Sequence, residues 1–97
     1  MNEMDESQND LNELRGRIDS IDGQIAGLLR GRFDAVKRVA AYKKAHGLEI
    51  TQKSREAEVL ARIAEIAGDD ALVVPRILEV YAEILKASRS LQTDLNI

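Results

Sequence analysis

Apolar residues recur at steps of three and four along most of the chain, which is the spacing of one face of an α-helix. The first such stripe runs without a break over residues 11–28, resumes at Ala35 and ends near Gly47. Glycine is the residue type that most often ends a helix, and Asp10, followed three residues later by a glutamate, has the spacing of an N-terminal capping box. The pattern therefore predicts one long helix over residues 10–45.

Two further stripes predict two shorter helices. The second helix is expected to start just after Thr51 and to end at Ala67, with Gly68 as its stop. The third is expected to start around Val73–Pro75, because proline is well suited to the first turn of a helix. No stretch alternates with a period of two, so we predict an all-α chain of three helices without strands.

The length of the first helix predicts a partner. Residues 10–45 span roughly 54 Å at ~1.5 Å per residue, whereas a compact globule of 97 residues has a radius of gyration of only about 12–13 Å. The helix must overshoot a monomeric core while still carrying an apolar stripe, and an intertwined helical homodimer would cover that stripe. The alternative is a kinked helix that folds back. The glycines that would permit a kink are Gly16, Gly23, Gly27 and Gly31.

Composition and charge narrow the classes of function. The 97 residues suffice for one domain, which we place at 10–97 after a polar, acidic and disordered tail at 1–9. The chain has no cysteine and one histidine, so thiol chemistry and His-based metal clusters are not expected. A net charge of −3 and 3% aromatic residues argue against a nucleic-acid partner. No apolar run is long enough to span a membrane and no signal peptide is evident, so we expect a cytoplasmic protein.

Polar residues interrupt the apolar stripes on all three predicted helices. Buried charges are costly unless they are paired, and the three cations in this set outnumber its one carboxylate. An anionic ligand would restore the balance, and arginine binds carboxylates through two parallel hydrogen bonds. The pattern thus favours a pocket for a small dicarboxylate. The interrupting residues are Arg32, Lys43, Arg55, Glu56, Ser88 and Gln92.

Each of these residues also has an interpretation without a ligand. A lone Arg or Lys in a helical stripe commonly extends its charged end into water, and a lone Glu, Ser or Gln is commonly a surface or core-edge residue. Arg15 adds a geometric constraint, because it lies about 25 Å from Arg32 along a straight helix and cannot reach the same small ligand. If the long helices run antiparallel in a dimer, Arg15 of the partner subunit can approach the pocket instead.

Several motifs in this order resemble the all-helical chorismate mutase family, over Leu11 to about Leu95. No single motif is specific, but the spacing between them fits the family without gaps. The motifs are Leu14-Arg15-x-x-Ile18-Asp19-x-Ile21-Asp22, Leu28-Leu29-x-x-Arg32, Lys43, Arg55-Glu56 and Ser88-x-x-x-Gln92.

The resemblance implies a stand-alone mutase that rearranges chorismate to prephenate, in the shikimate route to phenylalanine and tyrosine. By this analogy Lys43 and Gln92 flank the ether oxygen of the substrate, and Glu56 accepts a hydrogen bond from the ring hydroxyl. A Claisen rearrangement needs no nucleophile, metal or cofactor. It needs the substrate to be held in a reactive conformation and donors aimed at the oxygen that gains negative charge.

The same analogy assigns the remaining candidates to substrate binding. Arg15 of the partner subunit, Arg32 and Arg55 would bind the substrate, and Ser88 would assist at the ring carboxylate. Gln52 is a departure, since many relatives carry aspartate there to help hold the ring hydroxyl. We expect this change to tune the site, and it leaves room for another ring substituent such as an amine.

Two other functions stay open at this point. The same scaffold could serve as an isochorismate pyruvate lyase or a 4-amino-4-deoxychorismate mutase, although Glu56 and Ser88 favour the plain mutase. The same apolar stripes would also suit a helical dimerisation module without catalysis, in which the inward polar residues could be replaced without loss of role.

Overall fold

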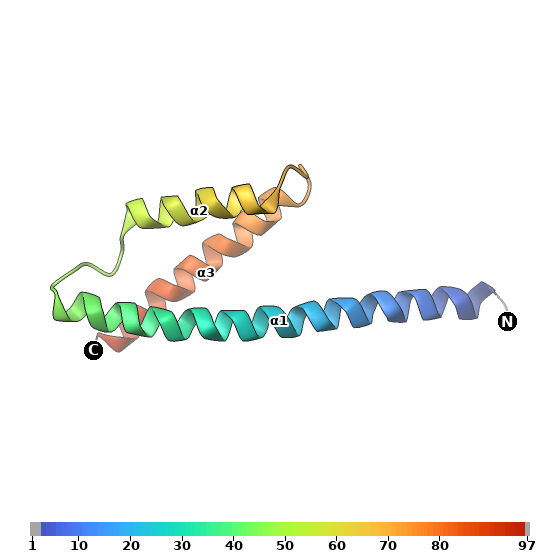
Figure 1. Cartoon of the computed structure of the whole chain (residues 1–97), viewed down its shortest axis with the longest axis horizontal. Coiled ribbons are helices and arrows are strands. Elements are labelled where there is room, and N and C mark those ends of the chain that lie inside the picture. Colours follow the sequence, from blue (N-terminus) through green and yellow to red (C-terminus); the bar gives the residue numbers. More distant parts are fainter. Residues whose placement is uncertain (1–2, 97) are drawn as a thin grey trace. The chain divides into compact units, whose positions relative to one another are not determined.

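The computed structural model has three helices, which confirms the predicted all-α chain. It describes residues 3–96, and the surroundings of side chains for 9–96, and no strand occurs within the described range. The helices are α1 (Glu3–Ala45), α2 (Lys53–Ala67) and α3 (Val74–Leu95), drawn in chain order in Figure 1.

Helix α1 begins earlier than the sequence pattern predicts. Its first residue is Glu3, so the N-cap predicted at Asp10 is wrong. Acidic side chains are favourable at a helix N-terminus, and Glu, Gln and Met are good helix formers, so the helix continues there without an apolar stripe. The disordered tail predicted for residues 1–9 lies partly outside the described residues, and its described part belongs to α1.

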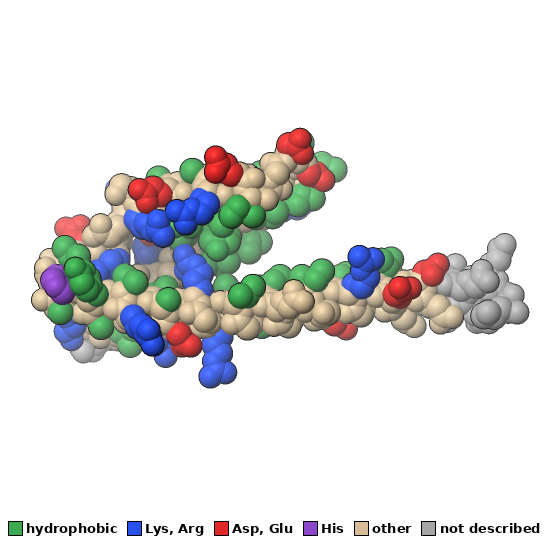
Figure 2. All heavy atoms as spheres, in the orientation of Figure 1, with side chains coloured by type: hydrophobic (Ala, Val, Ile, Leu, Met, Phe, Trp, Pro, Cys, Tyr) green, Lys and Arg blue, Asp and Glu red, His purple; other side chains and the backbone are tan. Residues whose placement is uncertain are grey.

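The chain divides into two compact units, and the described residues of the first unit, 3–34, all belong to α1. The apolar stripe of this unit is open to solvent, with side chains between 46% and 75% exposed. Figure 2 shows such hydrophobic side chains in a row along this part of the helix. Large apolar side chains in a continuous exposed row are typical of a surface that packs against a partner. The row consists of Leu11, Leu14, Ile18, Ile21, Ile25 and Leu28.

The second unit, Ala35–Ile97, holds the end of α1 together with α2 and α3. Helices α2 and α3 pack against each other as a hairpin (Figure 1). Gly68 ends α2 with a φ of 88°, a left-handed conformation that favours glycine, which confirms the predicted stop. The Asp70 carboxylate then accepts hydrogen bonds from the backbone N–H groups of Leu72 (2.9 Å) and Val73 (3.2 Å), and α3 begins as predicted.

Few apolar side chains are buried in the described part of the chain. Ala40 and Leu85 are the buried apolar residues, and two polar residues of α3, Ser88 and Gln92, are buried to the same extent. So small an apolar core is unusual for a chain of this length, since most of the stability of a domain comes from burying apolar surface. Two of the most buried side chains are therefore polar, and both are candidates for the functional site.

Candidate functional site

The end of α1 fixes the backbone around Lys43. Gly47 has a φ of 66°, and the N–H of Leu48 donates to the carbonyl of Lys43 at 2.8 Å, the bond that closes a Schellman motif. The chain then turns back, so that the carbonyl of Ile50 accepts a hydrogen bond from the Nζ of Lys43 at 2.6 Å. The loop after α1 thus ends the helix and also supplies an acceptor that orients the ammonium group.

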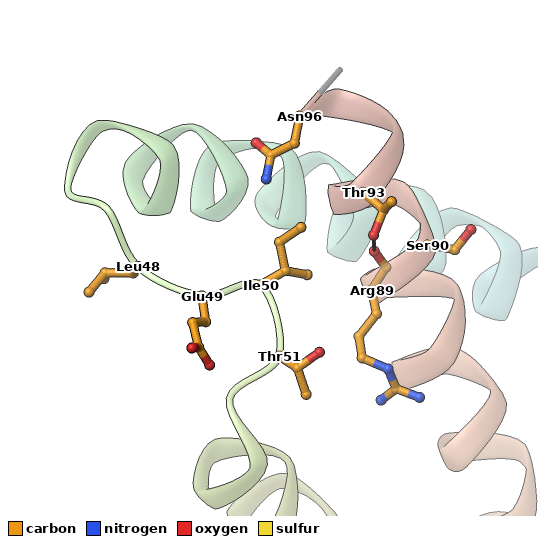
Figure 3. A pocket seen from close by; sticks show the side chains of 8 residues that line it. All are labelled: Leu48, Glu49, Ile50, Thr51, Arg89, Ser90, Thr93 and Asn96. Atoms are coloured by element: carbon orange, nitrogen blue, oxygen red, sulfur yellow. Dashed lines mark hydrogen bonds between the residues drawn. The ribbon is translucent and has the colours of Figure 1, made fainter.

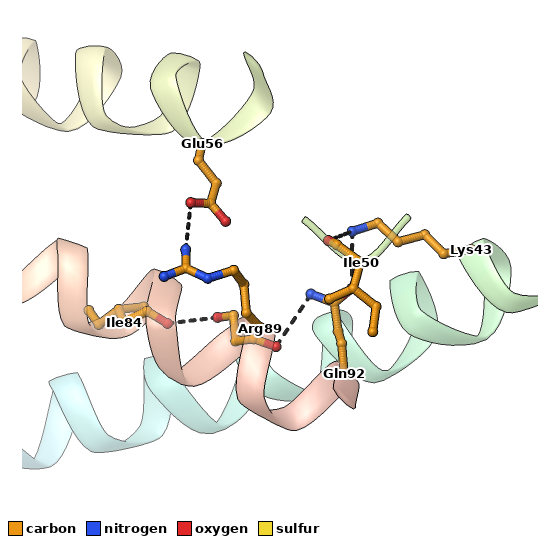
Figure 4. Close-up of polar contacts among 7 residues, drawn as sticks. Lys43, Ile50, Glu56, Ile84, Arg89 and Gln92 are labelled. Carbon is orange, nitrogen blue, oxygen red and sulfur yellow. Dashed lines mark hydrogen bonds and ion pairs between the residues drawn. The ribbon is translucent and has the colours of Figure 1, made fainter. Parts of the chain in front are cut away.

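The same ammonium group meets the side chain of Gln92 on α3. The Nζ of Lys43 donates to the Oε1 of Gln92 at 3.0 Å, and Gln92 is only 6% exposed (Figure 4). Because an ammonium can only donate, this contact turns the amide oxygen towards Lys43 and the amide nitrogen away from it. That nitrogen donates one hydrogen to the carbonyl of Ser88 at 3.3 Å, which leaves the other hydrogen for a ligand.

The first turn of α2 presents the candidate carboxylate. Gln52 precedes α2 and accepts the first helical hydrogen bond, from the N–H of Glu56, at 3.0 Å. Its side chain donates to the carbonyl of Glu49 at 3.2 Å, so it does not cap the helix. The Oε1 of Glu56 accepts from the Nη1 of Arg89 at 2.5 Å, and this ion pair joins α2 to α3.

Arg89 is absent from the sequence-based candidates, although the sequence carried a signal for it. Stepping one turn along α3 from Ile84 leads to Ser88, and the same step from Leu85 leads to Arg89. Both contacts thus involve one stretch of α3, residues 88–92, and we call the five residues of this region the polar cluster. They are Lys43, Glu56, Ser88, Arg89 and Gln92.

The polar cluster carries a net positive charge. Lys43 and Arg89 are cations, whereas Glu56 is the one acidic side chain among its members. The two neutral polar side chains donate to backbone carbonyls. The Oγ of Ser88 donates to the carbonyl of Ile84 at 2.8 Å, and the amide of Gln92 donates to the carbonyl of Ser88. A net positive, partly buried cluster with an oriented ammonium group suits an anionic ligand.

The three candidate arginines differ in where the structure places them. The side chain of Arg55 is 56% exposed and pairs with Glu58 on the same helix at 3.2 Å. Arg15 is exposed and Arg32 is partly exposed, and both belong to the first unit. The structure therefore brings together Lys43, Glu56, Ser88 and Gln92 from the predicted set, with Gln52 one turn before Glu56, and pairs Arg55 with Glu58 instead.

A shallow hollow of about 690 Å³ adjoins the polar cluster. Figure 3 shows it between the loop after α1 and the C-terminal half of α3. Arg89 lines it, but the ammonium of Lys43 and the amide of Gln92 do not, so the hollow borders the cluster and does not contain it. Its lining is Leu48, Glu49, Ile50, Thr51, Arg89, Ser90, Thr93 and Asn96.

The chain matches a known family over most of its length. Residues 14–93 match the model of chorismate mutase type II. The chain belongs to the type II chorismate mutase family. It is therefore an enzyme of the mutase class, which confirms the resemblance inferred from the motifs.

In the described part of the chain, no helix is both long and apolar enough to cross a membrane.

Three curated relatives in this family differ in their named activities. The chain is 35% identical over 78 residues to a 4-amino-4-deoxychorismate mutase from Streptomyces venezuelae, which covers 80% of this chain and 76% of the relative. It is 29% identical to a protein of the same name from Streptomyces pristinaespiralis, over 87% of this chain and 65% of the relative. It is 33% identical to the bifunctional chorismate mutase/prephenate dehydratase of Aquifex aeolicus, over 91% of this chain but only 25% of the relative.

Proposed function

We propose that the chain rearranges chorismate to prephenate. The observation that carries this proposal is the ammonium group of Lys43, held between the carbonyl of Ile50 and the buried amide of Gln92. In the rearrangement the ether C–O bond of the substrate breaks while a C–C bond forms, and negative charge builds up on the departing oxygen. Lys43 and the amide nitrogen of Gln92 are donors suited to that oxygen.

These donors act by stabilising the transition state more than the substrate. Their orientation is fixed before the substrate binds, because Lys43 and Gln92 are each bonded to the backbone as well as to each other. Preorganised donors of this kind typically contribute ~3–4 kcal/mol, or 10²–10³ in rate, because they need no reorganisation during the reaction. The remaining task is to hold the flexible enolpyruvyl arm over the ring in a reactive pose.

The other candidate residues would contact the ring and the carboxylates of the substrate. Glu56 has the acceptor that a ring hydroxyl needs, with Gln52 one turn before it. Ser88 is buried next to Gln92 and is assigned to the ring carboxylate. Arg32 and Arg55 are assigned to substrate binding by the family resemblance. For Arg55 this role requires its exposed side chain to leave Glu58, a contact that contributes at most about 1 kcal/mol.

We further propose that the active form is an intertwined homodimer with shared sites. The exposed apolar row of the first unit and the small apolar core of the described chain both support a partner that covers α1. A second copy of the chain offers the same apolar row, and two-fold dimers are the commonest oligomers. In this assembly Arg15 of the partner subunit completes each site.

Mixing two inactive variants tests the shared site. Arg15→Ala and Lys43→Ala should each be inactive alone, because each homodimer lacks a required group in both sites. After mixing and exchange of subunits, a mixed dimer has one intact site, so a one-to-one mixture should recover about a quarter of the wild-type activity. No recovery, with subunit exchange verified by a mass-tagged copy, would place Arg15 outside the partner's site.

A second candidate function is the rearrangement of 4-amino-4-deoxychorismate. Two curated relatives carry this name, one of them at 35% identity. Gln52 leaves room for a different ring substituent, since the site lacks the aspartate with which many relatives hold the ring hydroxyl. Glu56 argues for chorismate, because its carboxylate is already neutralised by Arg89 and gains less from a charged ring amine.

Three parallel assays separate the candidates. Purified protein is incubated with chorismate, with 4-amino-4-deoxychorismate and with isochorismate, and the products are resolved by liquid chromatography. We expect prephenate from chorismate with the highest kcat/KM. Salicylate and pyruvate from isochorismate, with chorismate unchanged, would indicate a lyase. Turnover of none of the three would contradict the proposed function and favour a dimerisation module.

A further inference from the structure

The ion pair between Glu56 and Arg89 is unlike the other one in the described part of the chain. It connects two helices, with the two side chains 25% and 34% exposed, whereas the pair of Arg55 and Glu58 lies on the surface of α2. Ion pairs on an exposed surface contribute little, but a partly buried, charge-assisted hydrogen bond fixes the geometry of both groups. The carboxylate of Glu56 is therefore held in one orientation.

The contact uses one oxygen of the carboxylate. Figure 4 shows the guanidinium of Arg89 bonded to the Oε1 of Glu56. The other oxygen, Oε2, has no protein hydrogen bond among the residues that the structure describes, so it remains an acceptor for a ligand. Arg89 lies one residue after Ser88 and three before Gln92, next to the buried face of α3 that carries both.

We propose that Arg89 is a positioning residue that holds Glu56 as a charge-compensated acceptor and thereby favours a neutral hydroxyl over a positively charged amine on the substrate ring. This inference rests on the proposed function. A hydroxyl donates to Oε2 without bringing charge to the site. An aliphatic amine is an ammonium at neutral pH, and beside Glu56 it would be attracted by the carboxylate but repelled by the guanidinium behind it.

The proposal makes opposite predictions for the two members of the ion pair. Arg89→Met removes the guanidinium and leaves the carboxylate, so the ratio of kcat/KM for chorismate to that for 4-amino-4-deoxychorismate should fall about tenfold, or ~1.4 kcal/mol. Glu56→Gln removes the carboxylate and leaves the guanidinium uncompensated, so the same ratio should rise. A purely structural role for the pair would lower both activities together and leave the ratio unchanged.

Matched variants distinguish charge from packing. Arg89→Lys keeps a cation at this position, and we expect it to restore the wild-type ratio to within about threefold, although lysine lacks the planar fork of arginine. Arg76→Met is the control, since Arg76 is an exposed arginine of the same helix that contacts only the carbonyl of Leu72 in the described structure. It should change neither the ratio nor the activity.

The measurements use the full chain, with kcat and KM for both substrates and thermal unfolding of each variant. A wild-type enzyme that prefers the amine, or an unchanged ratio in a folded Arg89→Met, overturns the proposal while the proposed reaction class stands. A wild-type protein that converts neither substrate overturns both. If Arg89→Met does not fold, Arg89→Gln and Glu56→Gln must still move the ratio in opposite directions for the proposal to hold.

Discussion

Replacing Lys43 with alanine is the most direct perturbation of the candidate site. The substitution removes the ammonium that donates to Gln92 at 3.0 Å and to the carbonyl of Ile50 at 2.6 Å. If this group stabilises the departing oxygen, kcat should fall by about 10²–10³, the usual consequence of losing a preorganised donor at a developing charge. The KM should change less, because the donor acts mainly in the transition state.

The same substitution should lower stability by a smaller, separately measurable amount. The Oε1 of Gln92, on a side chain that is 6% exposed, loses its donor, and an unsatisfied buried acceptor costs about 1–3 kcal/mol. Alanine avoids the ~1.5–2 kcal/mol of side-chain entropy that an ordered lysine can lose on folding, so the net loss should be no more than about 1 kcal/mol. For a chain of this size that corresponds to a decrease in Tm of at most about 4–8 °C.

Lys44→Ala is the matched control. Lys44 is the next residue, lies exposed in the same last turn of α1 and carries the same charge next to the helix C-terminus. It should retain the turnover of chorismate, followed by the loss of substrate absorbance at equal protein concentrations. A Lys43→Ala variant that is folded and keeps its turnover within about tenfold of the wild type would refute the proposed role of the ammonium.

Two further predictions concern the fold around the site. Gly47→Ala should destabilise the chain by about 1–2 kcal/mol in chemical denaturation, because a residue with a Cβ is disfavoured at a φ of 66°, even though a Cβ there would meet no atom within 4 Å. Gly47→Asn should destabilise it less, since asparagine tolerates this conformation better. Equal stability of all three proteins would contradict the assigned helix end. Ile18→Lys should convert a dimer to a monomer in sedimentation velocity and abolish activity. A change at a side chain that is 57% exposed in the single chain should otherwise fall within about 0.5 kcal/mol, so an unaffected dimer would show that α1 does not form the interface.

The fold was predictable because glycine and proline mark the helix boundaries. Gly47 and Gly68 both have positive φ, and α3 begins at Val74 next to Pro75, where the sequence pattern places them. The start of α1 was not predictable from periodicity, since residues 3–9 carry no repeating apolar pattern. Their preference for helix comes from intrinsic helix propensity and from acidic residues near the helix N-terminus, and neither of these signals is visible in the pattern of apolar residues.

The candidate site was predictable only in part. The position of a polar residue within a helical stripe shows whether it lies near an inward face. This reasoning selected Lys43 and Gln92, which are hydrogen-bonded to each other in the structure. The partner of each polar side chain depends on how one helix packs against another, which the sequence pattern does not give. The pairing of Glu56 with Arg89 is therefore known only from the structure. For Arg55, a glutamate three residues later on the same helix offers a competing partner, and the stripe alone does not decide between them.

The loop between α1 and α2 limits how this enzyme can be altered. Its backbone both closes the last turn of α1 and supplies the carbonyl of Ile50 that orients the ammonium of Lys43, so a residue inserted there would displace the acceptor from its donor. The turn between α2 and α3, residues 68–73, carries none of the polar cluster and is exposed. Affinity tags, reporter peptides or new chain termini should therefore be introduced at that turn.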